Sequence, residues 1–207
     1  MTATIILIGP HGAGKTTIAR LLANGLGWPY CPEIGDVLRR EALDLDPLAS
    51  AEKTQPEFDA EVMRREIERD LLWSGHGPRI VESWHLANLA YARQRSPCVA
   101  DRFQEVLRCA VEHAGLVLVQ PVSAEPCVLA RRQREPGSPE LCQPFFREVA
   151  DQAERIALSW GLTVLPSVDT TRGEPESCAR WIETRVRAFL PHLETTTCPP
   201  STRRVGP

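Results

Sequence analysis

Long apolar runs are missing from this chain of 207 residues. A membrane-spanning helix needs roughly 20 consecutive apolar residues, and no stretch of the sequence approaches that length. A secretory leader is not expected either, because a strand-like run and a glycine-rich loop follow the first residues directly. These absences predict a cytoplasmic protein without a membrane segment.

A large excess of charge of one sign is missing as well. The formal net charge is -3 at pH 7, so there is no electrostatic reason to expect nonspecific binding to nucleic acid. The seven cysteines contain no C-x-x-C pair, so we predict no metal centre or disulfide framework and expect most of them to be reduced core residues. With 43% hydrophobic residues, the chain is long enough for one globular domain.

The glycine-rich loop is the strongest signal in the sequence. Residues 9–16 read "GPHGAGKT" and fit G-x-x-x-x-G-K-[ST], between an apolar strand pattern at Thr4–Ile8 and a helical pattern from Lys15. Glycines let backbone N–H groups turn toward phosphate oxygens, and the helix N-terminus adds partial positive charge. The predicted phosphate-binding residues are Gly9, Gly12, Ala13, Gly14, Lys15, Thr16 and Thr17.

This loop, the P-loop, indicates ATP and Mg²⁺ as cofactors. We expect Lys15 to lie on the solvent side of the loop and reach the β- and γ-phosphates, and the Thr16 hydroxyl to ligate Mg²⁺. His11 is expected to face solvent.

Beyond the P-loop, short apolar strands alternate with helical patterns. Further strands are expected within residues 27–31, 79–81, 116–120 and 162–165, and helices at residues 33–43, 58–73, 85–95, 100–114, 124–134, 141–160 and 174–190. This order predicts an α/β fold with a five-stranded parallel sheet and helices on both faces. We expect one domain over residues 1–190, and a disordered tail over the Pro- and Thr-rich residues 191–207.

Two acidic residues follow predicted strands at the edge where ligands of such sheets bind. Glu33 comes after the second strand, where it is either a general base that takes a proton from a hydroxyl acceptor or a helix-capping carboxylate. Glu82 ends the third strand, where it either holds Mg²⁺ or the acceptor, or forms a structural ion pair. The nearby Trp84 is either a wall of the acceptor pocket or a core residue.

Arginines precede the flexible stretch "EPGSPEL". An arginine in a mobile lid can close over a transferring phosphoryl group. Arg131 and Arg134 are the predicted lid residues, with a solvated basic helix face as the alternative.

The segment "FDAEVMRREIERDLLWSGHGPRIVESWHLANLAY" at 58–91 resembles the thymidylate kinase family, and "RRQREPGSPELCQPFFREVADQAERIALSWGLTVLPSVDTT" resembles its lid, long helix and final strand. The resemblance implies a P-loop nucleoside or nucleotide kinase with an arginine-bearing lid. This sequence departs from the family at Ser83 and near Val62, where family arginines face the acceptor phosphate. Arg39, Arg40, Arg64 or Arg65 could replace them, or the acceptor carries a hydroxyl instead.

The sequence therefore predicts an ATP-dependent phosphotransferase with a nucleoside- or nucleotide-type acceptor. Lys15, Glu33, Glu82, Arg131 and Arg134 are the expected catalytic residues, with Thr16 and Glu82 at the metal. One alternative is a kinase for a hydroxyl of another small molecule or of a modified nucleobase, because "LANGLGWPY" resembles small-metabolite kinases for shikimate and gluconate. Another is a regulatory ATP-binding module without turnover. A homodimer stays an open possibility.

Overall fold

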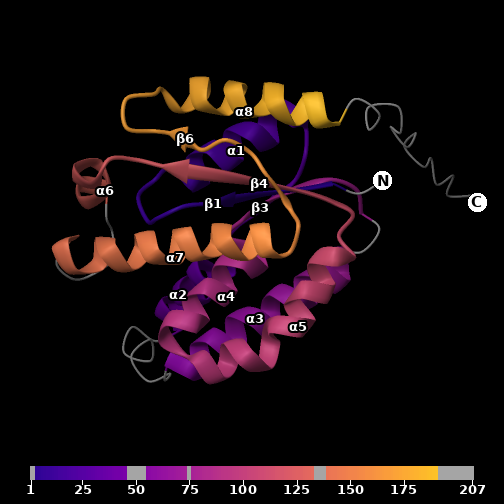
Figure 1. Ribbon diagram of the computed structural model, residues 1–207, viewed down its shortest axis with the longest axis vertical. Coiled ribbons are helices and arrows are strands. Elements are labelled where there is room, and N and C mark those ends of the chain that lie inside the picture. Colours follow the sequence, from indigo (N-terminus) through magenta and orange to yellow (C-terminus); the bar gives the residue numbers. More distant parts are fainter. Residues whose placement is uncertain (1–2, 46–54, 74–75, 133–138, 191–207) are drawn as a thin grey trace, which may run out of the picture.

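A computed structural model describes residues 3–45, 55–73, 76–132 and 139–190 of the chain. In these residues six strands alternate with eight helices (Figure 1). The strands are β1 (Ala3–Ile8), β2 (Tyr30–Cys31), β3 (Arg79–Glu82), β4 (Leu116–Ser123), β5 (Thr163–Val164) and β6 (Val168–Asp169). The helices are α1 (Lys15–Leu26), α2 (Ile34–Leu45), α3 (Gln55–Trp73), α4 (Trp84–Arg95), α5 (Pro97–Glu112), α6 (Pro126–Arg132), α7 (Pro139–Ser159) and α8 (Pro175–Phe189).

The strands pair in parallel in the order β2-β3-β1-β4-β5, and β6 pairs with the end of β4. The α/β prediction is confirmed, but the described sheet has six strands rather than five. The additional strand, β6, has only two residues, which is too short to show the period of a strand in the sequence. Because all strands run the same way, the segments after β1, β2, β3 and β4 emerge at one edge of the sheet.

Alternate residues of β1 face different helical layers. Ile6 and Ile8 belong to the core cluster shared with α3, α4, α5 and α7, whereas Ile5 and Leu7 belong to the cluster shared with α1 and α8. Figure 1 shows these two groups of helices on opposite sides of the sheet. The central strand is therefore apolar on both faces, as expected for a parallel sheet covered by helices.

The structure changes what we expect of the cysteines. Cys31 and Cys178 are buried, but Cys98, Cys109 and Cys127 are exposed, so the prediction that most cysteines lie in the core is wrong for these three. The exposed cysteines lie on the outer faces of α5 and α6.

The predicted tail over residues 191–207 and the predicted lid segment after Arg132 lie outside the described residues. Among the helices that the structure describes, none combines the length and apolarity needed to span a membrane.

Candidate active site

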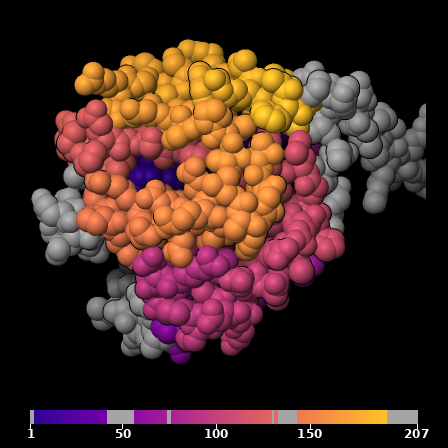
Figure 2. Space-filling view, in the orientation of Figure 1, coloured from indigo at the N-terminus to yellow at the C-terminus, as the bar shows by residue number. Residues whose placement is uncertain are grey.

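The P-loop borders a cavity of about 570 Å³ at the carboxyl edge of the sheet. Gly9, Gly12 and Gly14 have φ values of 151°, 82° and 87°, a region that favours glycine. A Cβ on Gly9 would lie 2.1 Å from the carbonyl oxygen of Val122 in β4, so this position also needs glycine for space. Figure 2 shows a hollow at this end of the molecule with residues from the N-terminal part of the chain at its floor.

Lys15 lies at the floor of this cavity and not on the solvent side of the loop. Its residue is only 7% exposed, and its Nζ donates hydrogen bonds to the carbonyl oxygens of Gly9 (2.9 Å) and Pro10 (3.3 Å). The expectation of a solvent-side lysine is therefore wrong. The ammonium group is already inside the loop that would surround the phosphates, so it can serve the predicted role from this position.

Glu82 ends β3 with its carboxylate toward the P-loop. Its Oε1 accepts a hydrogen bond from the Thr16 hydroxyl (2.8 Å), and its Oε2 accepts one from the Tyr30 hydroxyl (2.7 Å). Burial raises the pKa of Glu82, and the nearby Glu33 carboxylate adds to this increase, whereas the Lys15 ammonium opposes it. Burial likewise raises the pKa of the Tyr30 phenol, so the phenol stays a hydrogen-bond donor to Glu82.

The Thr16 and Glu82 oxygens fit a magnesium ion. Mg²⁺ is usually held by one or two protein oxygen ligands together with substrate phosphates and water, and these two oxygens lie 2.8 Å apart beside the P-loop. In the part of the chain that the structure describes, no group of three or more His, Cys, Asp or Glu side chains could hold a metal by itself. The donor set therefore suits an ion that arrives with a nucleotide.

Glu33 lies between β2 and α2 and lines the same cavity. Its side chain is 12% exposed, its Oε2 accepts a hydrogen bond from the Ser83 hydroxyl (2.9 Å), and its Oε1 lies 3.8 Å from Arg39 Nη2. Burial pushes the pKa of Glu33 upward, but Lys15, His11, Arg39 and the Ser83 hydrogen bond together hold it below its usual range. Glu33 is therefore an ionised carboxylate that faces the P-loop.

The turn that carries Ser83 is strained. Ser83 and Trp84 have φ values of 67° and 47°, and they are the residues other than glycine with positive φ in the described chain. Both are buried, and the Ser83 N–H donates to the carbonyl oxygen of Leu7 (2.9 Å). Such strain persists where the surroundings determine the conformation, commonly at functional sites. Here one turn places both Glu82 and the hydroxyl that holds Glu33.

The arginine beside the P-loop is Arg132, which the sequence analysis did not select. Its Nη1 lies 3.4 Å from the carbonyl oxygen of Gly12 and 3.4 Å from the Thr170 hydroxyl, and the residue lines the cavity. Arg131 is exposed, outside the cavity lining, and its Nε donates to Cys127 O within α6, so its predicted place at the phosphates is not supported by the geometry. Arg134 lies outside the described residues.

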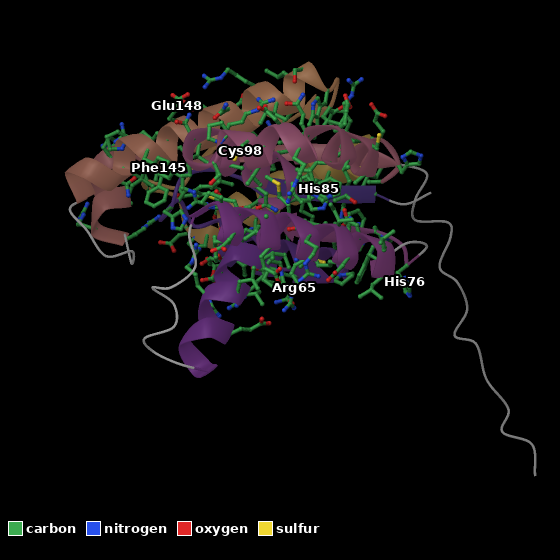
Figure 3. All side chains as sticks on the ribbon, turned by 90° about the horizontal axis from the view of Figure 1, so that it is seen from below. Arg65, His76, His85, Cys98, Phe145 and Glu148 are labelled. Atoms are coloured by element: carbon green, nitrogen blue, oxygen red, sulfur yellow. The ribbon has the colours of Figure 1, made fainter. Side chains whose placement is uncertain are left out.

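Part of the cavity wall is formed by α2. Asp36, Arg39 and Arg40 line it, and Arg40 pairs with Asp36 at 2.5 Å. Arg64 and Arg65 were expected at the same cleft, but they are absent from its lining and pair with glutamates on the surface of α3 and α2. Figure 3 shows Arg65 on the outer side of its helix.

Trp84 is fully buried, and its Nε1 donates to the Asp70 carboxylate, so it is a core residue and not a pocket wall.

Two further contacts join the P-loop to later parts of the chain. His11 is half-buried and stacks on Phe146 of α7 at 4.2 Å between ring centroids, so the expectation of a solvent-facing loop residue is wrong. Thr170, after β6, is buried and its hydroxyl donates to Ala13 O at 2.9 Å. The local sequence signals neither contact, because both partners are distant along the chain.

A Walker-type P-loop after the first strand of a parallel α/β sheet, facing acidic residues from two neighbouring strands, defines a P-loop phosphotransferase-type site. A family model described as "AAA domain" matches residues 4–168, well over half of the chain. The chain therefore belongs to this family.

Two proteins of similar sequence are both kinases. A shikimate kinase from Methylococcus capsulatus is 29% identical over 150 residues, which cover 71% of this chain and 79% of that protein. A shikimate kinase from Moorella thermoacetica is 38% identical over 69 residues, or 33% of this chain and 39% of that protein. The predicted class, an ATP-dependent kinase, is confirmed by these relatives.

Solved structures confirm the fold. The deoxyadenosine kinase from M. mycoides with bound dATP matches with a TM-score of 0.62 and 14% identity, over 89% of this chain and 99% of that chain. At this identity the likeness shows the P-loop kinase fold alone. The finer resemblance to thymidylate kinases stays a prediction.

Proposed function

We propose that the chain transfers the γ-phosphate of ATP to a hydroxyl group of a small-molecule acceptor, with Glu33 as the general base. The observation that carries this proposal is the state of Glu33. It is a mostly buried, ionised carboxylate on the cavity wall, oriented by the Ser83 hydroxyl at 2.9 Å. A hydroxyl acceptor must lose its proton during transfer, and a positioned carboxylate can take it.

The positions of the missing family arginines support a hydroxyl over a phosphate acceptor. Ser83 and Val62, which stand where thymidylate kinases have arginines, are neutral and buried. An acceptor phosphate needs positive charge around it more than it needs a base. Here the residue at position 83 is used instead to orient a carboxylate. Nucleosides and hydroxy acids such as shikimate, the substrate in the name of two relatives, both carry a suitable hydroxyl.

The other residues of the cavity complete the proposed reaction. The P-loop amides, Lys15 and Arg132 bind the triphosphate and neutralise the charge of the transferring group. Thr16 and Glu82 would hold Mg²⁺, which would supply positive charge to neutralise the phosphates when it is bound. Glu33 accepts the proton of the acceptor hydroxyl at its carboxylate.

The test combines an acceptor panel with one substitution. The parent protein and Glu33→Gln are incubated with γ-labelled ATP and with nucleosides, nucleoside monophosphates and hydroxy acids including shikimate. We expect a labelled hydroxyl compound with the parent, and a kcat lower by about 10²–10⁴ with Glu33→Gln, the usual contribution of a general base. The control is Glu41→Gln, which changes an exposed glutamate of α2 outside the cavity.

Three results would contradict the proposal. Near-parent kcat in Glu33→Gln would remove Glu33 as the base. Label found only on the phosphate of monophosphates would remove the hydroxyl acceptor and return attention to Arg39 and Arg40. Failure to label any acceptor, together with tight ATP binding, would favour the regulatory-module alternative.

A further inference from the structure

A buried ion pair on α3 lies behind the segment that carries Glu33. Glu66 is completely buried and pairs with Arg69, whose side chain is 17% exposed. The second oxygen of Glu66 accepts a hydrogen bond from Asn88 of α4 at 3.2 Å. Arg69 then donates from Nη1 to the carbonyl oxygen of Pro32 at 2.6 Å. This chain of contacts joins the middle of the helical layer to the residue directly before Glu33.

The backbone around Glu33 has little support from the sheet. β2 contains only Tyr30 and Cys31, which pair with Ile80 and Val81 of β3. Pro32 follows, and a proline has no N–H to extend a strand ladder. Glu33 comes next, and α2 begins at Ile34. The Glu33 carboxylate therefore follows a strand of only two residues, although a general base must lie within about 1 Å of its working position.

A buried ion pair is a poor way to stabilise a fold. Removing two charges from water offsets most of their attraction, and apolar pairs of similar size often give equal or greater stability. Arg69 Nε is also buried without a hydrogen-bond partner among the described residues. An apolar replacement could reproduce neither the contact to Pro32 O nor the hydrogen bond from Asn88, and of these two the contact to Pro32 O is the one that reaches the segment with Glu33.

We propose that Arg69 is a positioning residue for the base: held by Glu66, it fixes the Pro32 carbonyl and so keeps the Glu33 carboxylate against Ser83 and the P-loop. This inference rests on the proposed role of Glu33. Arg69 is absent from the cavity lining, so it acts through the backbone of Pro32 and Glu33 and not on the acceptor. A misplacement of about 1 Å at a reacting group can lower a rate by about 10²-fold.

The test is a double-mutant cycle with the acceptor found above. We expect Arg69→Met to lower kcat by about 10–10²-fold, with the KM for ATP within about twofold of the parent, because the donor residues lie on other elements. In Glu33→Gln/Arg69→Met the second substitution should have almost no further effect, because the base that it positions is gone. The matched control is Arg64→Met, which removes an exposed arginine of the same helix that pairs with Glu61 and Glu68.

Folding is controlled with a second variant. Arg69→Met leaves Glu66 buried without its partner, so Glu66→Gln/Arg69→Met removes both charges, keeps an acceptor for Asn88, and should melt near the parent temperature while keeping the low kcat. Parent-like kcat in either variant overturns the proposal. So does a kcat loss in Glu33→Gln/Arg69→Met that equals the product of the losses in the two single variants. If Glu33→Gln is itself parent-like, the proposed function fails, and that result is distinct from a parent-like Arg69→Met beside an impaired Glu33→Gln.

Discussion

Arg131 and Arg132 are neighbours in the chain but lie in different surroundings. Arg132 reaches the P-loop at Gly12 and the Thr170 hydroxyl, whereas Arg131 is exposed and bonded within α6. We expect Arg132→Ala to lower kcat by about 10²-fold, the effect of removing one donor that stabilises transition-state charge, and to weaken ATP binding less. Arg131→Ala should stay within about twofold. Steady-state kinetics and nucleotide titration measure both, and a larger kcat loss in Arg131→Ala would reverse the assignment.

This pair also shows how far single residues could be predicted. Thr16 and Glu82 hydrogen-bond to one another, and the motif and the strand end that fix their positions are both visible in the sequence. The choice between adjacent arginines depends on the rotation of α6, which has only seven residues and whose apolar residues are consecutive, so that no helical period defines its inner face. Arg132 and Thr170 line the cavity through contacts between distant parts of the chain, which sequence spacing does not encode.

At the scale of elements, the strained turn between β3 and α4 leads to a prediction about the free energy of unfolding. Ser83→Ala and Ser83→Gly both remove the hydroxyl that holds Glu33, but only alanine keeps a Cβ at φ 67°, ψ -57°. Relief of backbone strain should exceed the entropic penalty of glycine, so we expect Ser83→Gly to be about 1–2 kcal/mol more stable than Ser83→Ala. Denaturant unfolding gives the two free energies. Equal values, or a more stable alanine variant, would show that the turn stores no strain.

Long helices and strands are the easiest elements to predict from the sequence. The helical pattern from Phe58 and the apolar run after Gly115 correspond to α3 and β4, because each has enough residues for its period to be visible. The strands β2, β5 and β6 have two residues each. Strands were expected where β2 and β5 lie, but β6 was not expected, and its pairing with β4 is set by the tertiary structure around it. The strained turn at Ser83 could not be anticipated, since serine and tryptophan do not favour positive φ.

For the whole molecule, nucleotide binding should appear as added stability. A non-hydrolysable ATP analogue with Mg²⁺ at 100 times its Kd should add about 2.7 kcal/mol, which corresponds to a rise in Tm of about 5–10 °C for a domain of this size. Lys15→Ala should lose most of this rise, because the ammonium at the cavity floor is removed. Thermal melts with and without the analogue measure the effect. The same rise in both proteins would contradict the assignment of Lys15 to the phosphates.

The ATP-binding half of the site is attached to longer strand pairings than the half that carries Glu33. The donor half, with the P-loop, Thr16 and Glu82, is built on β1, β3 and β4, whose registers are fixed over several residue pairs. The half that carries Glu33 depends on a two-residue strand, on α2, which lines the cavity, and on Arg69 of α3, which holds the Pro32 carbonyl. We expect substitutions on α2 to change which molecule is phosphorylated, while ATP binding stays close to that of the parent. Directed evolution toward a new acceptor should therefore collect its changes in α2, and the inner strands should keep their sequence.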